Sequence, residues 1–468
     1  MLNIKNGLFM KKGYVIILTL LSALPNFGQK KIAQQQVIQD LHFLRESLEE
    51  AHYNLYAYIT KEAFNKNFED VKSSITKDSL STLEITSLFQ AVISKANNGH
   101  TEISFPGSVY INYAYSGGTV FPLELAFEHG KVLVRKNWSQ NHALAPGAEV
   151  KSINNLPMDE VLQKIYPLLS AERRYFKLAK LELMSFPRLY WQAFGEQKNF
   201  EVEINKKGDI ETHIIHSIRV LEDYEMKRNE VYSDKRELKF LNQAAYLKPG
   251  NFGGDEQKYR SFIDSSFVEI KTKGLPALII DFRNNLGGDD TFSDYLVSYI
   301  ADRPFRWNSE FTLKTSAILK KHVRKNYDTT SVYWQKVLTH EDGSTYPYEF
   351  PLYNPQPADK RYSGKVYVLV NRQSHSQSAV TAAQIQDYKF ATIVGEETGD
   401  FPSLYASQYS YVLPHTAIEV KLSKGYIVRV NGSKKAEGVI PDMYIKDHLL
   451  DEDDEILDGL VKYIENEH

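Results

Sequence analysis

The feature that most constrains this chain is an alternation of apolar runs and helical patterns in its second half. Residues 276–282 and 365–371 are apolar runs, and a stretch with apolar residues at helical spacing follows each of them. Shorter strands are expected at 244–247 and 391–395. Strands and helices that alternate in this way predict an α/β fold with a mostly parallel sheet covered on both faces.

Ligands of such sheets usually bind beyond the carboxyl ends of the strands. In this chain those ends are residues 283–288, 371–376 and 396–399. We therefore expect the functional residues of the sheet in these three segments.

The first half of the chain has two other patterns. Apolar residues recur every three or four positions at Val37, Leu41, Leu44 and Leu48, and a second periodic stretch covers 82–96, so we expect an N-terminal helical domain over 29–105. Short strand-like runs at 120–127 and 131–136 predict a β-rich module. The expected ranges are 106–220 for this module, 221–448 for the core, near 304–360 for a Tyr- and Trp-rich insertion that could act as a lid, and 449–468 for a C-terminal helix.

The N-terminus has the pattern of a secretory signal. Lys11 and Lys12 precede an apolar run over 14–24, and polar residues follow Gly28. The run is shorter than the roughly 20 apolar residues that span a membrane. We therefore expect a signal peptide over 1–28 and a periplasmic or secreted mature chain without an integral membrane segment.

Composition excludes several kinds of site. The chain has no Cys, so it has no cysteine nucleophile, thiolate zinc site or iron–sulfur cluster. Its 56 basic and 59 acidic side chains give no basic surface for nucleic acid. Catalysis would therefore need hydroxyl, imidazole, carboxylate or lysine chemistry. The sequence indicates no oligomeric state.

Two of the polar segments at strand ends contain groups that could bind an oxyanion or act as a nucleophile. Residues 284–288 end in Gly-Gly, which forms either an ordinary tight turn or a nest of backbone N–H groups facing an oxyanion. Residues 374–378 open a helix, where a hydroxyl is either an N-cap or a nucleophile.

Two further segments contain groups that could act on a proton. His100 follows the second helical stretch, and Gly99 suits a left-handed helix C-cap there. A lone histidine is more often structural than catalytic. Glu437, in the segment 434–442, would ordinarily be a surface turn residue.

In this order, the segments resemble the C-terminal processing (tail-specific) serine peptidase family, in the branch similar to the tricorn protease core. The matching segments are residues 98–101, 278–288, 366–376, 393–399 and 438–442. The resemblance implies a crotonase-like (ClpP-like) spiral ββα core and a PDZ-like module within 106–220. It also implies a secreted or periplasmic endopeptidase that hydrolyses unfolded or C-terminally presented proteins.

The resemblance also implies serine peptidase chemistry that needs no metal or organic cofactor, and it implies roles for individual residues. Ser376 corresponds to the nucleophile, His100 to the general base and Glu437 to the acidic group that orients the base. The implied oxyanion donors are the backbone amides of Gln377, Gly288 and Gly287, with Gly288 preferred over Gly287.

The chain departs from the family pattern at four places, one of which is Leu286 in place of the first Gly of the common Gly-Gly-Gly turn. Members with a Ser–Lys dyad have lysine where this chain has Phe401, although Lys421 or Lys424 could replace it. Tricorn has a serine before the catalytic histidine, and this chain has Gly99. The acid that usually precedes Gly-His is Asn98 here, which removes a charge close to the base.

Other functions remain open. The 30 Tyr and 24 Phe suit a peptide cleft, but they also suit a catalytically silent protein of the same fold that binds an apolar or peptide ligand. Thioester chemistry on coenzyme A conflicts with export and with the lack of a basic phosphate site. His375 adjoins Ser376, but neighbouring side chains on one strand point to opposite faces, which argues against His375 as the base.

Overall fold

The computed structural model describes residues 31–206, 208–228, 231–232 and 234–467. The signal peptide expected over 1–28 lies outside these ranges. Within the described ranges, no helix has both the length and the apolar character needed to cross a membrane.

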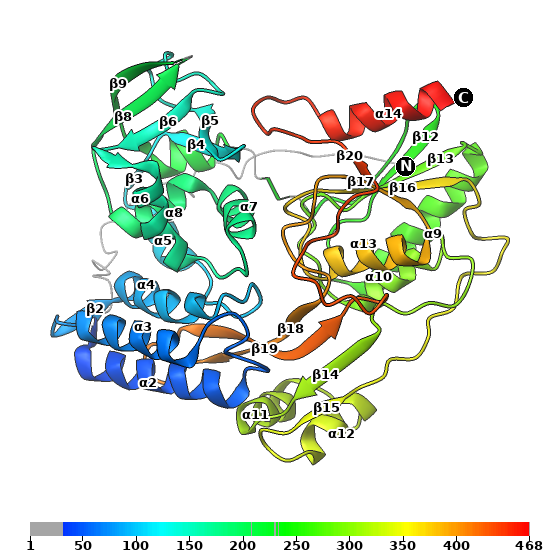
Figure 1. Ribbon diagram of the computed structural model, residues 1–468, viewed down its shortest axis with the longest axis horizontal. Coiled ribbons are helices and arrows are strands. Elements are labelled where there is room, and N and C mark those ends of the chain that lie inside the picture. The colour runs from blue at the N-terminus through cyan, green and yellow to red at the C-terminus, as the bar shows by residue number, and fades with distance from the viewer. Residues whose placement is uncertain (1–30, 207, 229–230, 233, 468) are drawn as a thin grey trace, which may run out of the picture.

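The second half of the chain contains a six-stranded sheet (Figure 1). Its strands lie in the order β11 (Glu237–Phe240), β12 (Ala244–Lys248), β13 (Ala277–Asp281), β16 (Lys365–Val370), β17 (Thr392–Gly395) and β20 (Met443–Tyr444). Neighbours from β12 to β20 pair in parallel, and β11 is an antiparallel edge strand. The prediction of a mostly parallel sheet is confirmed.

Helices cover both faces of this sheet. The helices of one face are α9 (Glu256–Lys273), α10 (Asp290–Val297) and α13 (Gln377–Tyr388), and α14 (Glu455–Glu467) lies on the other. Successive strand residues point to opposite faces, so Leu278 and Ile280 pack with the first group while Ala277 and Ile279 pack with α14. Because both faces are buried, β13 is apolar at each of these positions.

The N-terminal helices share their core with strands from the end of the chain. The helices are α2 (Gln34–Ala51), α3 (Lys61–Ser74) and α4 (Thr82–Ile93), and α4 begins at a capping box formed by Ser81 and Glu84. The four periodic residues predicted for α2 are fully buried. They pack in one cluster with Tyr409 of β18 (Leu404–Val412) and Leu422 of β19 (Glu419–Val428).

The insertion near 304–360 joins this C-terminal hairpin. It contains β14 (Glu310–Lys314), α11 (Ala317–Asn326), α12 (Val332–Thr339) and β15 (Thr345–Pro347). Strand β14 pairs with β19, giving an antiparallel sheet in the order β15-β14-β19-β18. The insertion is therefore anchored in the fold by a strand.

A separate antiparallel sheet follows the N-terminal helices (Figure 1). Its strands are β4 (Leu123–Glu128), β5 (Lys131–Asn137), β6 (Glu149–Ile153), β7 (Leu156–Pro157), β8 (Asn199–Lys206) and β9 (Asp209–His216). The helices that pack on it are α6 (Met158–Ile165), α7 (Arg174–Met184) and α8 (Phe186–Phe194). The smaller elements nearby are β1 (Lys31–Ala33), β2 (Ser79–Ser81), η2 (Ser94–Ala96), α5 (Gly107–Tyr115), β3 (Thr119–Val120), η3 (Tyr166–Leu168), β10 (Ile218–Arg219) and η4 (Val220–Glu225).

A buried arginine connects this antiparallel sheet to the large sheet. The guanidinium of Arg372, in the turn after β16, donates to Glu128 of β4 at 2.7 Å, to Glu182 of α7 at 2.7 Å and to Glu396 after β17 at 2.9 Å. All four side chains are buried. Removal of one partner from such a group leaves uncompensated buried charge, so the connection is sensitive to substitution.

Candidate active site

Ser376 lies in the turn between β16 and α13 and has an unusual backbone conformation. Its φ of 54° and ψ of −127° are rare for a residue with a side chain. Ser376 is at the N-cap position of α13, yet its side chain makes no capping hydrogen bond. Its backbone N–H donates to Oδ2 of Asp400 at 2.8 Å. The ordinary capping role therefore does not explain this hydroxyl.

A cavity of about 450 Å³ opens at Ser376. Gly288 and Gln377 line it beside the serine. The inserted segment supplies the aromatic side chains Trp307, Phe311, Tyr327, Tyr333, Trp334 and Phe350 of its wall. The cavity is thus bounded by the segments that follow β13 and β16, by the insertion, and by the hairpin of β18 and β19.

The Gly287–Gly288 turn is closely packed against neighbouring backbone. Both glycines have positive φ, 84° and 139°, and a Cβ on Gly288 would lie 1.8 Å from the Phe252 carbonyl oxygen. The N–H of Gly287 donates to Oδ1 of Asn285 at 2.8 Å. The two backbone bonds that flank Gly288, from Phe252 to Gly287 and from Asp289 to Phe252, do not use the Gly288 N–H. The Gly288 amide therefore stays available beside Ser376.

The loop that bears His100 follows η2. Asn97, not Gly99, takes the left-handed conformation there with a φ of 49°, so the expected C-cap at Gly99 is wrong. Gly99 is needed for space instead, because a Cβ would lie 2.8 Å from a ring carbon of Phe176. Lys180 Nζ donates to the Gly99 carbonyl at 2.9 Å, and Gln408 Nε2 donates to the His100 carbonyl at 2.6 Å.

The His100 side chain is buried without hydrogen bonds. It is 2% exposed, and neither ring nitrogen has a partner in the part of the chain that the structure describes. Burial, together with the positive charge of Lys180, lowers the pKa of His100 to about 3. The imidazole is therefore neutral at pH 7 and can accept a proton during a reaction.

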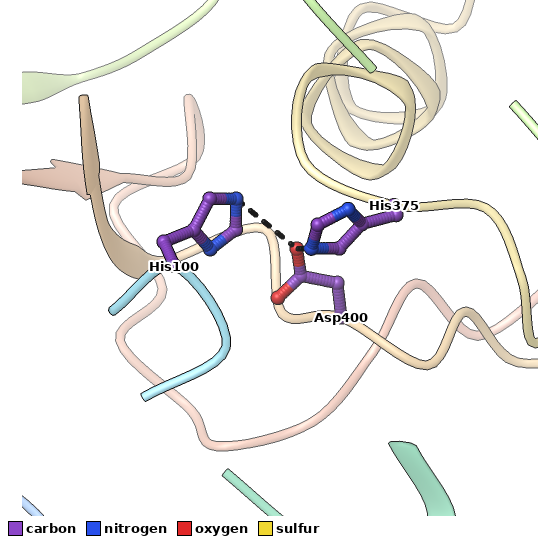
Figure 2. Close-up of side chains that lie close together, drawn as sticks. All are labelled: His100, His375 and Asp400. Carbon is purple, nitrogen blue, oxygen red and sulfur yellow. Dashed lines mark ion pairs between the residues drawn. The ribbon is translucent and has the colours of Figure 1, made fainter. Parts of the chain in front are cut away.

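Asp400 and His375 complete the surroundings of His100 (Figure 2). Asp400 Oδ2 lies 3.8 Å from Nε2 of His100 and 3.3 Å from Nε2 of His375, and the two imidazole rings stack with centroids 4.7 Å apart. Burial, then the neighbouring Glu172, raises the pKa of Asp400 to about 8. Glu172 in turn accepts the Gly99 N–H at 2.7 Å.

Two expectations from the sequence differ from this arrangement. Glu437 is half-exposed and pairs with Lys435 at 3.7 Å, and no hydrogen bond or ion pair joins it to His100 in the described ranges. The argument that His375 points away from the site is wrong, because residues 374–376 lie in a turn and not in a strand. The acid beside His100 is Asp400, which the sequence motifs did not single out. Its place at the carboxyl end of β17 was the available signal.

The two lysines that could replace the missing dyad lysine have different surroundings. Lys421 pairs with Glu102 at 3.2 Å, whereas Lys424 lines the cavity that contains Ser376. Lys424 is buried, and its Nζ donates to the carbonyl and hydroxyl oxygens of Ser407 at 2.8 and 2.7 Å. Burial lowers the pKa of Lys424 to about 7.

Comparisons with known proteins relate this chain to a family of peptidases. Residues 243–445 match the model of peptidase family S41. The Tail-specific protease of Haemophilus influenzae is 28% identical over 184 residues, which are 38% of this chain. The match spans 21% of that curated relative's length.

Solved structures extend the similarity to most of the chain. The crystal structure of mature CPAF has a TM-score of 0.62 at 15% identity, covering 92% of this chain and 96% of that chain. Mature CPAF complexed with lactacystin has a TM-score of 0.61 at 15% identity, with 92% and 97% covered. At this identity the likeness shows the fold alone.

Proposed function

Because residues 243–445 form a domain of the serine-type C-terminal processing peptidases of family S41, we propose that this chain is a serine endopeptidase with Ser376 as its nucleophile. His100 acts as the general base, and the backbone amides of Gly288 and Gln377 form the oxyanion hole. The observation that carries the proposal is the Ser376 turn. Ser376 has a strained backbone, and its hydroxyl makes no helix-capping hydrogen bond. It lines the same cavity as Gly288 and Gln377, whose backbone amides are the proposed oxyanion donors.

The proposed acid beside the base is Asp400 and not Glu437. Asp400 is fully buried, accepts a hydrogen bond from the backbone N–H of Ser376, and faces Nε2 of His100. The raised pKa keeps the resting carboxyl group of Asp400 mostly protonated at pH 7, and its ionised form stabilises the imidazolium that forms during the reaction. Asp400 is thus assigned as a positioning residue that acts through both His100 and the Ser376 turn.

The proposed reaction proceeds in two steps. Ser376 Oγ attacks the peptide carbonyl while its proton moves to His100, and the amides of Gly288 and Gln377 bind the oxyanion. The C–N bond then breaks as His100 returns the proton to the leaving amine, which leaves an acyl-enzyme. Water repeats the sequence on the ester and releases Ser376.

Lys424 is the alternative base. It lines the same cavity as Ser376, and its lowered pKa gives a substantial neutral fraction at pH 7. Both hydrogen bonds recorded for its Nζ go to Ser407, however, whereas both nitrogens of His100 are unpaired in the described ranges. The proposal therefore assigns the base to His100.

Further parts of the proposal concern the substrate and the compartment. The large sheet is proposed to be a crotonase-like core, and the sheet from β4 to β9 a PDZ-like module that binds substrate C-termini. Arg372 supports a structural connection between the module and the active site, because it lies in the turn before Ser376 and donates hydrogen bonds to Glu128 and Glu182 of the module. The proposed substrates are unfolded or C-terminally presented proteins, in the periplasm or outside the cell.

Cleavage of unstructured peptides by the mature chain tests the proposal. Ser376→Ala should abolish cleavage, and His100→Ala should reduce it by at least about 100-fold. Ser378→Ala is the matched control, because this serine is buried in α13 with its hydroxyl toward the Phe282 carbonyl. Full activity of Ser376→Ala would refute the assignment, and loss in Lys424→Met but not in His100→Ala would transfer the base to Lys424.

Substrate presentation is tested with the same peptides carrying free or amidated C-termini. Faster cleavage of the free carboxyl form supports C-terminal capture, and equal rates contradict it. If the wild-type chain cleaves no peptide but binds one, the silent binding protein becomes the better description.

A further inference from the structure

His100, His375 and Asp400 bring three metal-binding atoms together at the edge of the large sheet. Each residue offers one ligand atom, and these three atoms lie within 4.8 Å of one another, although the residues come from three separate loops. Asp400 Oδ2 is 3.3 Å from His375 Nε2 and 3.8 Å from His100 Nε2. Figure 2 shows both imidazoles directed at the carboxylate between them.

The nitrogen atoms in this cluster lack the hydrogen bonds that buried polar groups normally make. Both nitrogens of His100, which is 2% exposed, and Nε2 of His375 have no partner in the described ranges. Nε2 of His375 lies 3.3 Å from Oδ2 of Asp400. These unpartnered nitrogens are therefore able to bind a metal ion.

The donor set fits a zinc ion. Two imidazole nitrogens and one carboxylate oxygen, with a fourth position open, are the ligands of many zinc sites. At Zn–N and Zn–O distances of about 2.0–2.2 Å, tetrahedral ligand atoms lie roughly 3.3–3.6 Å apart. The two measured separations require only small side-chain movements to reach this range. The carboxylate is already held by the N–H groups of Ser376 and Phe401, at 2.8 and 2.9 Å.

We propose that His100, His375 and Asp400 bind one Zn²⁺ and that this ion reversibly inhibits the peptidase. The inhibition rests on the proposed function. With a metal on Nε2, the neutral imidazole of His100 carries its proton on Nδ1, so neither nitrogen can accept the proton of Ser376. The metal also draws Asp400 away from its role beside that base. Glu172 lies close enough to Asp400 to raise its pKa, and Lys180 lies close enough to lower it, so the charges around the site partly offset each other.

A second cluster provides a matched control. His448, Asp451 and Glu455 also have ligand atoms within 4.8 Å of one another, but none of these side chains is buried. The imidazole of His448 is already engaged, with Nε2 2.6 Å from Glu455. Removal of His448 therefore takes a surface histidine from a comparable set without affecting the buried site.

Zinc binding is measured by titration calorimetry of the mature chain with ZnCl₂, with Co²⁺ absorption as a second readout. We expect one zinc ion per chain at the buried site, binding at least about 100-fold more weakly in His375→Ala and unchanged in His448→Ala. Visible Co²⁺ bands should disappear in His375→Ala. Equal zinc affinity of His375→Ala and wild type, or loss of binding in His448→Ala, would overturn the site.

Inhibition is measured separately on peptide cleavage. Added Zn²⁺ should stop cleavage and EDTA should restore it, and His375→Ala should need at least tenfold more zinc for half-inhibition. Activity that EDTA abolishes and zinc restores would overturn the inhibition. A chain that binds zinc through these residues but cleaves no peptide would refute the proposed function and the inhibition, while it would support the metal site itself.

Discussion

Replacement of Ser376 by glycine is expected to abolish peptide cleavage and to leave the folded protein more stable than the alanine variant. Alanine keeps a Cβ at the φ of 54° and ψ of −127° that this position requires, whereas glycine has none. Both variants lack the hydroxyl and keep the backbone N–H that bonds Asp400. The comparison of the two therefore isolates the cost of the backbone conformation.

The magnitude follows from two opposing contributions. A residue with a side chain in such a sparsely populated region costs about 1–3 kcal/mol of folding free energy, which glycine relieves. The additional freedom of glycine in the unfolded chain costs about 0.5–1 kcal/mol. The glycine variant should thus exceed the alanine variant by roughly 1 kcal/mol in free energy of unfolding.

Urea unfolding of both variants, followed by tryptophan fluorescence, measures this difference. The matched control is the pair Ser378→Gly and Ser378→Ala, because Ser378 lies inside helix α13. There glycine should be less stable than alanine by about 1 kcal/mol, the opposite sign. An alanine variant of Ser376 that is as stable as the glycine variant would refute the claim that the nucleophile turn is strained.

Three further substitutions test other parts of the structure. Gly288→Ala should reduce peptide cleavage at least about 100-fold, since its Cβ would meet the Phe252 carbonyl at 1.8 Å and displace an oxyanion donor; unchanged kcat would contradict this. Arg372→Met should lower the free energy of unfolding by about 3–5 kcal/mol because three buried carboxylates lose the guanidinium that they share. The exposed Arg174→Met should change it by less than about 0.5 kcal/mol, and similar melting temperatures of the two variants would disprove the link. Lys424→Met should stabilise the protein at pH 7 by about 1–3 kcal/mol, because burial lowers the pKa of this lysine to about 7. Between pH 7 and about 10 the unfolded chain therefore binds one more proton than the folded chain, so the stability of the wild type should rise with pH relative to that of the variant. Urea midpoints of the two proteins that change in parallel between pH 7 and 9.5 would contradict this.

The sheet could be predicted from the sequence because its strands are buried on both faces. Ala277 and Ile279 are buried on one face and Leu278 and Ile280 on the other, so the strand is a continuous apolar run. A strand with one exposed face would instead alternate apolar and polar residues. The helical pattern at Val37 could be predicted for a similar reason, since one buried face repeats along the helix.

The site could be predicted only where local geometry determines it. Gly288 lies in a turn that needs positive φ, which its residue type indicates. Asp400 belongs to the site because the fold brings its Oδ2 atom within 3.8 Å of Nε2 of His100, which lies on another loop. No local sequence pattern indicates this contact. For the same reason the motif alone suggested Glu437, which pairs with Lys435 at the surface. The roles of Ser376 and His100 and the domain boundaries stay predictions.

The shared core of the N-terminal helices and the C-terminal hairpin has a consequence for biosynthesis. His100 is held by Gln408, and Glu102 beside it pairs with Lys421 across a β-bridge. A ribosome makes these partners about 300 residues later, so a nascent chain has the histidine long before the strands that bury it. The order of synthesis thus delays assembly of the site until most of the chain has been made.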